Sequence, residues 1–455
     1  MAEAQFTWLH LGLGSFHRAH QAMYLQRLHE AGDARWTLAA GNIVPGMEDV
    51  ATALRAQGGA YTLETVTPEG ARRYERIESI RQVLPWDERL SGVVAVGAQP
   101  DTRIVSFTVT EAGYSLDDAP AEATALREGR PVRTIYGALA AILRERLRAN
   151  SGPVTLLNCD NLRHNGVRVR EGLLRFLALV GDEALLGWVE ANTRCPNAMV
   201  DRITPRPTAE VVQRVRAATG RDDPAALMAE DFTQWVIEDD FIAGRPEWER
   251  VGVEMVESVA AHEEAKIRLL NGTHSCIAWA GTLAGYRYIH EGVRDPRIRQ
   301  LAHDYVTEDV IPVLSPSPIA LEAYRDTVLH RFASAALADT NQRVAMDGFA
   351  KIPGFIAPTV RERLARNEAI DRVAVLPALF LACLQRWHRG TLAYEYQDQA
   401  MDPAAAHAIC AAADPVVALC ADTTLWGATA GDGRLLAALR RAHRLVRAFE
   451  EEALP

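Results

Sequence analysis

A lysine, an asparagine and a histidine share one amphipathic stretch, EEAKIRLLNGTHSCIAWAGTL, which covers residues 263–283. On an α-helix that advances about 100° per residue, Lys266, Asn271 and His274 fall within an arc of roughly 140°. An amine can take the proton of an alcohol when burial and a neighbouring cation, here Arg268, lower its pKa toward neutrality. The three side chains therefore predict the base and the hydroxyl contacts of an alcohol dehydrogenase. A solvated helix face is the simpler alternative.

Oxidation of an alcohol also needs hydrogen-bond donors for the alkoxide that develops, and two asparagines are placed to supply them. Asn161 stands at the end of the apolar segment Pro153–Asn161, which is typical of a strand buried on both faces. The carboxyl ends of strands are where open α/β sheets bind ligands. Gly272 costs a helix about 1 kcal/mol relative to alanine, so we expect a close neighbour there, such as the strand that carries Asn161.

The segment HLGLGSFHRAH, residues 10–20, has the pattern of a strand end, a glycine turn and a helix start. Gly12 and Gly14 allow a tight turn and the close approach of a pyrophosphate to the helix N-terminus. His17 occupies the place of the usual third glycine, so we expect helix and strand to pack less closely than in the common dinucleotide fingerprint. Asn42, beyond the next predicted strand, can bond a ribose and favours NAD over NADP. The same turn also occurs as plain architecture.

Two further motifs carry charged side chains between prolines and glycines. The motif PNAMVDRITP predicts a rigid loop that presents the Asp201 carboxylate, or an ordinary ion pair with Arg202. The motif NQRVAMDGFAKIP predicts a loop in which Arg343 and Lys351 bind polyol hydroxyls or a carboxylate, or are surface charges.

Strand and helix signals alternate through the first half of the chain, whereas helical segments dominate after about Glu263. Strands are predicted at Phe6–Leu11, Trp36–Ala40, Arg103–Thr110 and Pro153–Asn161, and helices at Ser15–Ala31 and Thr134–Arg148. This alternation predicts an α/β fold with a Rossmann-like, doubly wound parallel sheet and helices on both sides. We expect an NAD-binding domain over residues 1–258, followed by a mostly α-helical substrate and catalytic domain over residues 259–455.

Composition and charge exclude several classes of function. The chain has 455 residues and a formal net charge of −10, which argues against a nucleic-acid or anionic-membrane binder. Its longest apolar run, Val373–Leu384, is too short to span a bilayer and predicts a buried helix. The sequence shows no secretory signal and its six cysteines are scattered, which predicts a cytoplasmic protein. His17 and His20 are spaced like metal ligands, but no thiol or carboxylate nearby completes a site, so no metal is predicted.

Five segments together resemble the polyol-specific long-chain dehydrogenases, the mannitol dehydrogenase family: GLGSFHRAHQ, TVTEAGY, NCDN, CPNAMVDRITP and EEAKIRLLNGTHS. The resemblance implies that Lys266 is a metal-independent general base, with Asn161 and Asn271 holding the alkoxide. It also implies that His274 contacts a substrate hydroxyl and that Glu263 helps to pass the proton to solvent.

The resemblance extends to the binding of substrate and cofactor. Substrate contacts are implied at Val200, Asp201, Arg343 and Lys351. Cofactor contacts are implied at Gly12, Leu13, Gly14, Ser15, Phe16, His17, Arg18, Asn42, Thr110 and Glu111. A histidine in place of the third glycine is the family's own pattern. The chain departs from the family at Ala112, where a second glycine is usual, and this departure bears on how the nicotinamide is positioned.

The implied activity is the NAD-dependent oxidation of a secondary hydroxyl of an acyclic polyol to a ketose. Four segments, FTWLHLGLGSFHRAHQA, LLNCDNLRHNG, SCIAWAGTL and DTNQRVAMDGFAKIP, favour D-arabinitol, oxidised to D-xylulose. Oxidation of mannitol to fructose and reduction of a hexuronate (fructuronate or tagaturonate) are open alternatives. A nucleotide-binding sensor without catalysis is the non-enzyme alternative, and a methyltransferase would have no use for the lysine–asparagine–histidine helix. The resemblance also implies a monomer.

Overall fold

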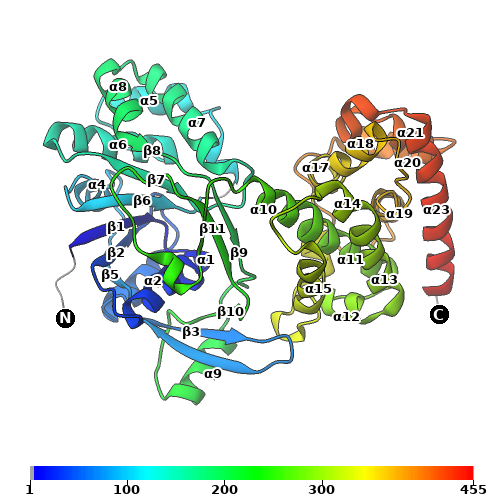
Figure 1. Cartoon of the computed structure of the whole chain (residues 1–455), viewed down its shortest axis with the longest axis horizontal. Helices are drawn as coiled ribbons and strands as arrows, with labels where there is room; N and C mark the ends of the chain where they lie inside the picture. Colours follow the sequence, from blue (N-terminus) through cyan, green and yellow to red (C-terminus); the bar gives the residue numbers. More distant parts are fainter. Residues whose placement is uncertain (1–4, 110, 454–455) are drawn as a thin grey trace. The chain divides into compact units, whose positions relative to one another are not determined.

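The computed structural model describes residues 5–109 and 111–453, and the chain divides into two compact units (Figure 1). The first unit comprises the residues up to Thr67 together with Ala71–Ala260, and the second comprises Pro68–Gly70 with the residues from Ala261 onward. Within the described residues, we find no helix that combines the length and the apolar character needed to cross a membrane.

The first unit is built on a six-stranded sheet in which every pair of neighbouring strands is parallel. Across the sheet the strands are β5 (Ile80–Leu84), β2 (Trp36–Gly41), β1 (Phe6–Leu11), β6 (Thr102–Phe107), β7 (Val154–Asn158) and β8 (Thr193–Arg194). The chain runs outward from β1 to β5 and then returns to place β6 on the other side of β1. Sheets of this kind bind ligands in the crevice where the strand order reverses. The predicted Rossmann-like fold is confirmed.

The two faces of this sheet are covered differently, because alternate residues of a strand point to opposite sides. Leu9 and Leu11 of β1 pack against one group of helices. These helices are α4 (Ser91–Gly97), α5 (Ala119–Arg127), α6 (Ile135–Ala149), α7 (Asn165–Val180) and α8 (Glu183–Asn192). Trp8 faces the other side, where its ring centroid lies 6.0 Å from that of Trp235 and 5.1 Å from that of Trp248. That second side is covered by α2 (Gln21–Glu30) and by strands as well, not by helices alone.

Two three-stranded sheets that the sequence did not predict complete the first unit. One joins β10 (Leu227–Glu230), β3 (Tyr61–Val66) and β4 (Arg72–Ile77), and the other joins β12 (Glu254–Val256), β11 (Gln234–Glu238) and β9 (Ala198–Asp201). The helices α3 (Glu48–Ala56) and α9 (Ala209–Thr219) also belong to this unit. The predicted rigid loop at Asp201 is wrong, because Asp201 ends a strand that pairs antiparallel with β11 and sets Val200 opposite Trp235.

The helix predicted at Ser15–Ala31 is broken at His20. The first piece, α1, covers Ser15–Ala19, and α2 follows it. His20 has φ −124° and ψ −83°, which lies outside the helical region. Its Nε2 is 2.9 Å from the carbonyl oxygen of Gln234, so a contact with a distant strand holds the break open.

The second unit consists mainly of helices, which confirms the prediction for this half of the chain (Figure 1). They are α10 (Ala260–Ala265), α11 (Gly272–Leu283), α12 (Ile289–Arg294), α13 (Pro296–Asp304), α14 (Ile311–Leu314), α15 (Leu321–Arg331), α16 (Asn341–Ala345), α17 (Gly348–Lys351), α18 (Ala357–Ala365), α19 (Val375–His388), α20 (Pro403–Ala411), α21 (Pro415–Ala421), α22 (Thr423–Trp426) and α23 (Gly433–Ala453). Helix α11 lies at the centre and contacts α12, α13, α16 and α19. Helix α19 is buried along most of its length, as predicted for Val373–Leu384.

Candidate active site

A π-helical turn, Lys266–Asn271, separates α10 from α11. A π-turn bonds each residue to the one five positions away, so Lys266 and Asn271 stand one turn apart on the same face. The prediction of a regular α-helix, which sets these two residues about 140° apart, is wrong in this respect. The extra residue of the turn also rotates His274 toward Lys266. The three side chains therefore share a narrower face than the sequence predicted.

Tyr305 packs against this π-helical turn. It is fully buried, and its hydroxyl donates a hydrogen bond of 2.6 Å to the carbonyl oxygen of Arg268. A Cβ atom on Gly272 would overlap that hydroxyl. The close neighbour that Gly272 accommodates is therefore a tyrosine of the same unit. The approach of the strand that carries Asn161 stays a prediction.

Arg268 does not act as an uncompensated cation beside Lys266. Its guanidinium lies 2.5 Å from the carboxylate of Glu264 and 2.7 Å from that of Glu362. Although burial lowers the pKa of Arg268, the two carboxylates raise it above its usual value. The predicted lowering of the Lys266 pKa by Arg268 stays a prediction. Lys266 itself is 6% exposed, and burial of an amine disfavours its charged form in general.

His274, which follows the π-helical turn on α11, faces a carboxylate. Its Nε2 lies 3.2 Å from Asp339 Oδ2, and its ring stacks on Phe332 with a centroid distance of 4.3 Å. Burial lowers the pKa of His274 in spite of the carboxylate, so the ring is neutral. Asp339 favours the tautomer that carries its proton on Nε2, which leaves Nδ1 to accept a hydrogen bond from a hydroxyl.

Arg343 and Lys351 lie on the short helices α16 and α17, so the loop predicted for them is wrong. Arg343 Nε and Nη2 donate hydrogen bonds of 2.7 and 2.6 Å to Asp339, the carboxylate that also faces His274. Lys351 Nζ donates to the carbonyl oxygen of Val344. Burial lowers the pKa of Lys351 to about 8. The structure thus brings three predicted side chains of the second unit together around Asp339, which the sequence did not point to.

Lysine is rare in this chain. Of the 49 lysine and arginine residues, all but Lys266 and Lys351 are arginines. An arginine stays protonated in a protein, whereas an amine can lose its proton. Both lysines of the chain occupy positions that the sequence predicts for the site. A count of residue types in the sequence is enough to reveal the two positions, a signal that the motifs alone do not give.

The loop predicted to bind the cofactor follows β1, where the strand order reverses. Gly12 has φ +132°, and a Cβ there would lie 3.2 Å from Thr108 Oγ1, so the position requires glycine. Gly14 is the N-cap of α1, and a Cβ there would meet no atom within 4 Å. Asn42 Oδ1 accepts a hydrogen bond of 2.9 Å from Leu13 N. The predicted ribose contact thus also ties the second strand to the loop.

His17 and Arg18 support this loop from inside the first unit. The His17 ring stacks on His10 of β1, with centroids 3.5 Å apart, and fills the space beside the strand. Burial lowers the pKa of His17 to about 3, so the ring is neutral. Arg18 is 1% exposed and donates a hydrogen bond of 3.1 Å to the carbonyl oxygen of Leu13. Thr110, another predicted cofactor contact, lies outside the described residues, as does the side chain of Glu111.

Asn161 is exposed and lies beyond the end of β7, because the strand stops at Asn158. Its loop is fixed by neighbouring polar groups. Asp160 N donates to Asn158 Oδ1, and Val109 N donates to Asp160 Oδ2, both at 2.8 Å. Asn165 Nδ2 donates to the carbonyl oxygen of Asp160 at 3.0 Å. The backbone before Asn161 is therefore tied to the segment after β6.

Three further predicted site residues are buried, whereas Ser15, Phe16 and Asn271 are half-buried. Val200 and Asp201 are 3% and 5% exposed on β9, and Glu263 is 4% exposed on α10. Among residues 5–109 and 111–453, no group of three histidine, cysteine, aspartate or glutamate side chains is arranged to hold a metal ion.

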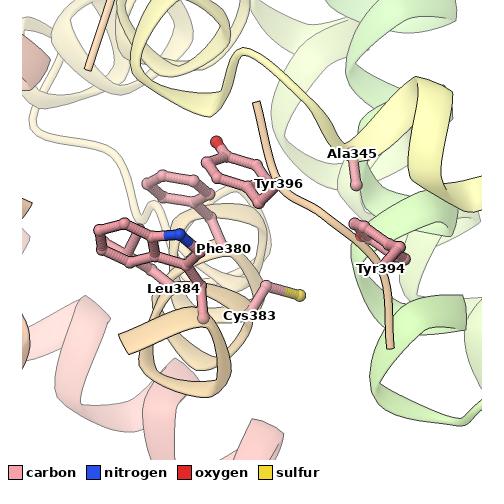
Figure 2. Close-up of a pocket in the computed structure, with 7 residues that line it drawn as sticks. Ala345, Phe380, Cys383, Leu384, Tyr394 and Tyr396 are labelled. Carbon is pink, nitrogen blue, oxygen red and sulfur yellow. The ribbon is translucent and has the colours of Figure 1, made fainter. Parts of the chain in front are cut away.

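A pocket of the second unit contains none of the predicted site residues (Figure 2). It is lined by Ala345, Phe380, Cys383, Leu384, Trp387, Tyr394 and Tyr396. Its two tyrosine hydroxyls are already bonded, that of Tyr394 to Thr282 at 2.9 Å and that of Tyr396 to Asp398 at 2.7 Å. An aromatic and aliphatic lining of this kind does not suit a polyol.

Both halves of the chain match one family of proteins. Residues 7–250 match the mannitol dehydrogenase Rossmann domain, and residues 258–443 match the mannitol dehydrogenase C-terminal domain. The chain belongs to the mannitol dehydrogenase family. This membership confirms the resemblance and the oxidoreductase class that it implied.

Relatives in this family match nearly the whole chain. A D-arabinitol 4-dehydrogenase of Ralstonia nicotianae is 58% identical over 97% of this chain and 96% of its own length. A D-arabinitol 4-dehydrogenase of Klebsiella pneumoniae is 53% identical over 96% of this chain and 97% of its own length. The Pseudomonas fluorescens mannitol 2-dehydrogenase, solved as a ternary complex with NAD and D-mannitol, is 32% identical with a TM-score of 0.83, covering 99% of this chain and 94% of that one.

We expect Gly272→Ala to lower the free energy of unfolding by about 1–3 kcal/mol, because the added methyl group overlaps the Tyr305 hydroxyl. Thermal unfolding of the full chain, followed by circular dichroism, measures the loss. The same substitution in a Tyr305→Phe background should be less harmful, because the overlapping oxygen is gone. Equal losses in the two backgrounds would contradict the proposed packing.

We expect the Lys351 amine to titrate near pH 8 instead of 10.5, because burial disfavours its charged form. Labelling with ε-¹³C-lysine gives two side-chain NMR signals from this chain, and Lys351→Arg assigns them. Since the unfolded chain keeps this proton to higher pH, the wild type should also gain stability relative to Lys351→Met between about pH 8 and 10. A Lys351 signal that moves only above about pH 10 would rule out the inferred environment.

Proposed function

We propose that the protein oxidises D-arabinitol to D-xylulose with NAD. The identity to two D-arabinitol 4-dehydrogenases over nearly the full length of the chain carries this proposal. The mannitol 2-dehydrogenase of known structure is much less similar in sequence, which places mannitol second. The side chains of the second unit support the proposal, because they include an amine, an amide and an imidazole of the kinds that such a reaction needs.

Lys266 is the base in this proposal. Its amine takes the proton of the carbinol hydroxyl as the carbon loses a hydride and the C–O bond becomes a carbonyl. The hydride acceptor is the nicotinamide ring when NAD is bound. Asn271, one π-turn away, donates a hydrogen bond to the developing alkoxide, and His274 Nδ1 accepts one from a neighbouring hydroxyl. The roles implied for Asn161 and for the substrate and proton-relay positions Val200, Asp201 and Glu263 stay predictions.

The loop after β1 fits a dinucleotide. The space that a Cβ on Gly14 would occupy is open, and no side chain of the described residues caps the N-terminus of α1 there. In this proposal Gly12–Arg18 hold the pyrophosphate at the reversal of the strand order. The segment after β2, which begins Asn42-Ile43-Val44, carries no arginine to pair with a 2′-phosphate, and this supports NAD over NADP.

The charges around Asp339 favour a polyol over a hexuronate. Two donors of Arg343 already bond Asp339, so a substrate carboxylate would have to compete for that guanidinium. Lys351, with a pKa of about 8, is in part neutral at slightly alkaline pH. An uncharged polyol needs neither a free guanidinium nor a charged amine in order to bind. The predictions of a monomer and of a cytoplasmic location stay predictions.

With purified protein and NAD, we expect NADH absorbance to rise fastest with D-arabinitol, ahead of mannitol, xylitol, L-arabinitol and sorbitol by about tenfold or more in kcat/KM. Lys266→Ala should lower kcat about 10²–10⁴-fold near neutral pH, because the proton acceptor is lost, while NADH binding survives. Arg444→Ala, on the exposed side of α23, is the matched control and should leave turnover unchanged.

Two outcomes would remove the proposal. If no polyol is oxidised and no ketose or keto-uronate consumes NADH, the chain is not a polyol dehydrogenase. If Lys266→Ala keeps its full rate, Lys266 is not the base.

Gly12 and Gly14 should respond differently to alanine. We expect Gly12→Ala to lower the free energy of unfolding by about 1–3 kcal/mol, because its φ excludes a side chain. We expect Gly14→Ala to fold normally but to weaken NADH binding about tenfold or more, because its methyl group fills the space left for the pyrophosphate. Thermal unfolding and NADH fluorescence titration separate the two effects. Wild-type affinity in Gly14→Ala would exclude this loop as the cofactor site.

A further inference from the structure

Asp339 links two side chains that are predicted to contact the substrate. Its Oδ2 lies 3.2 Å from His274 Nε2 and 2.6 Å from Arg343 Nη2, and its Oδ1 accepts a hydrogen bond of 2.7 Å from Arg343 Nε. Burial raises the pKa of Asp339, but the two hydrogen bonds from Arg343 and the nearby His274 ring outweigh it and hold the pKa below its usual value. The carboxylate is therefore ionised wherever the protein is folded near neutral pH.

The backbone around Asp339 is fixed by its neighbours. Its carbonyl oxygen accepts a hydrogen bond of 2.9 Å from Ile289 N, and the next residue, Thr340, forms an antiparallel bridge with Tyr288. The side chain of Arg343, by contrast, is 65% exposed. A carboxylate on a fixed turn therefore positions the more exposed guanidinium through two hydrogen bonds.

Acidic groups outnumber basic ones in this cluster. Asp347, Asp398 and Asp339 all raise the pKa of the Lys351 amine, whereas Arg343 lowers it. These three carboxylates and two basic groups leave the cluster without a net positive charge. A polyol can form hydrogen bonds here, whereas a sugar acid brings a carboxylate that must compete with Asp339 for Arg343.

We propose that Asp339 is a specificity-determining residue, an inference that rests on the proposed polyol oxidation. Asp339 neutralises Arg343 and holds His274 in the tautomer that accepts a hydroxyl. The site thereby selects uncharged polyols against sugar acids of the same carbon chain. Asp339 already occupies the Arg343 guanidinium, so a substrate carboxylate must displace Asp339 in order to bind it. This competition selects polyols against sugar acids.

The decisive variant is Asp339→Asn, which keeps the shape of the side chain and removes its charge. The probe is D-arabinonate, which has a carboxylate in place of one terminal hydroxymethyl group of D-arabinitol. Calorimetry on the full chain with NADH should show D-arabinonate binding about fivefold tighter to the variant than to the wild type. The KM for D-arabinitol should rise, because the asparagine amide no longer fixes the His274 tautomer.

The double variant Asp339→Asn/Arg343→Gln tests whether the released guanidinium causes the gain. Its affinity for D-arabinonate should return to the wild-type value. Added salt should shrink the gain in the single variant, since the attraction is electrostatic. A loss of structure alone would lower the affinity for both ligands and could not raise the affinity for one of them.

Unchanged or weaker binding of D-arabinonate by a folded Asp339→Asn variant would overturn the inference. If this variant does not fold, Arg343→Gln decides. It should lower the affinity for D-arabinonate no more than the affinity for D-arabinitol. A selective loss of affinity for D-arabinonate would show that the arginine charge was available in the wild type, and would overturn the inference. A wild type that oxidises no polyol overturns the proposed function alone, and the calorimetric comparison still decides the role of Asp339.

Discussion

The hydrogen bond from Tyr305 to the carbonyl oxygen of Arg268 is the constraint on which the second unit's candidate site depends. A π-turn carries one residue more than an α-helical turn and persists where tertiary contacts support it. Tyr305 supplies that support and fills the space beside Gly272. Because of it, an amine, an amide and an imidazole share one face although their spacing in the sequence does not fit a single stripe of an α-helix.

Elements whose signal is local were predicted closely. Strand β1 has the predicted bounds, and α6 begins one residue after the predicted Thr134, whose hydroxyl caps the helix. An apolar stripe and a capping side chain suffice for such elements. The chemistry proposed for Lys266 and His274 was read from their residue types, and their roles stay predictions.

Features set by partners far along the chain escaped prediction. The break at His20 depends on Gln234, and the π-turn depends on Tyr305. No residue inside either segment therefore predicts the break or the π-turn. Asp339 was missed for the same reason, since it meets His274 only after folding. The prolines and charged residues that flank β9 are typical of a loop, and the strand between them is short. Its pairing with the neighbouring strand β11 stabilises it.

Arginine serves as the structural cation in this chain. Arg146 is fully buried and donates to the carbonyl oxygens of several residues at once, a task for a planar fork and not for a single ammonium group. Lysine is left for Lys266 and Lys351. Primary amines are the side chains that condense with open-chain sugars to form Schiff bases. With only two ε-amines, one buried and one half-buried, the chain offers few lysine side chains for glycation by a reducing sugar.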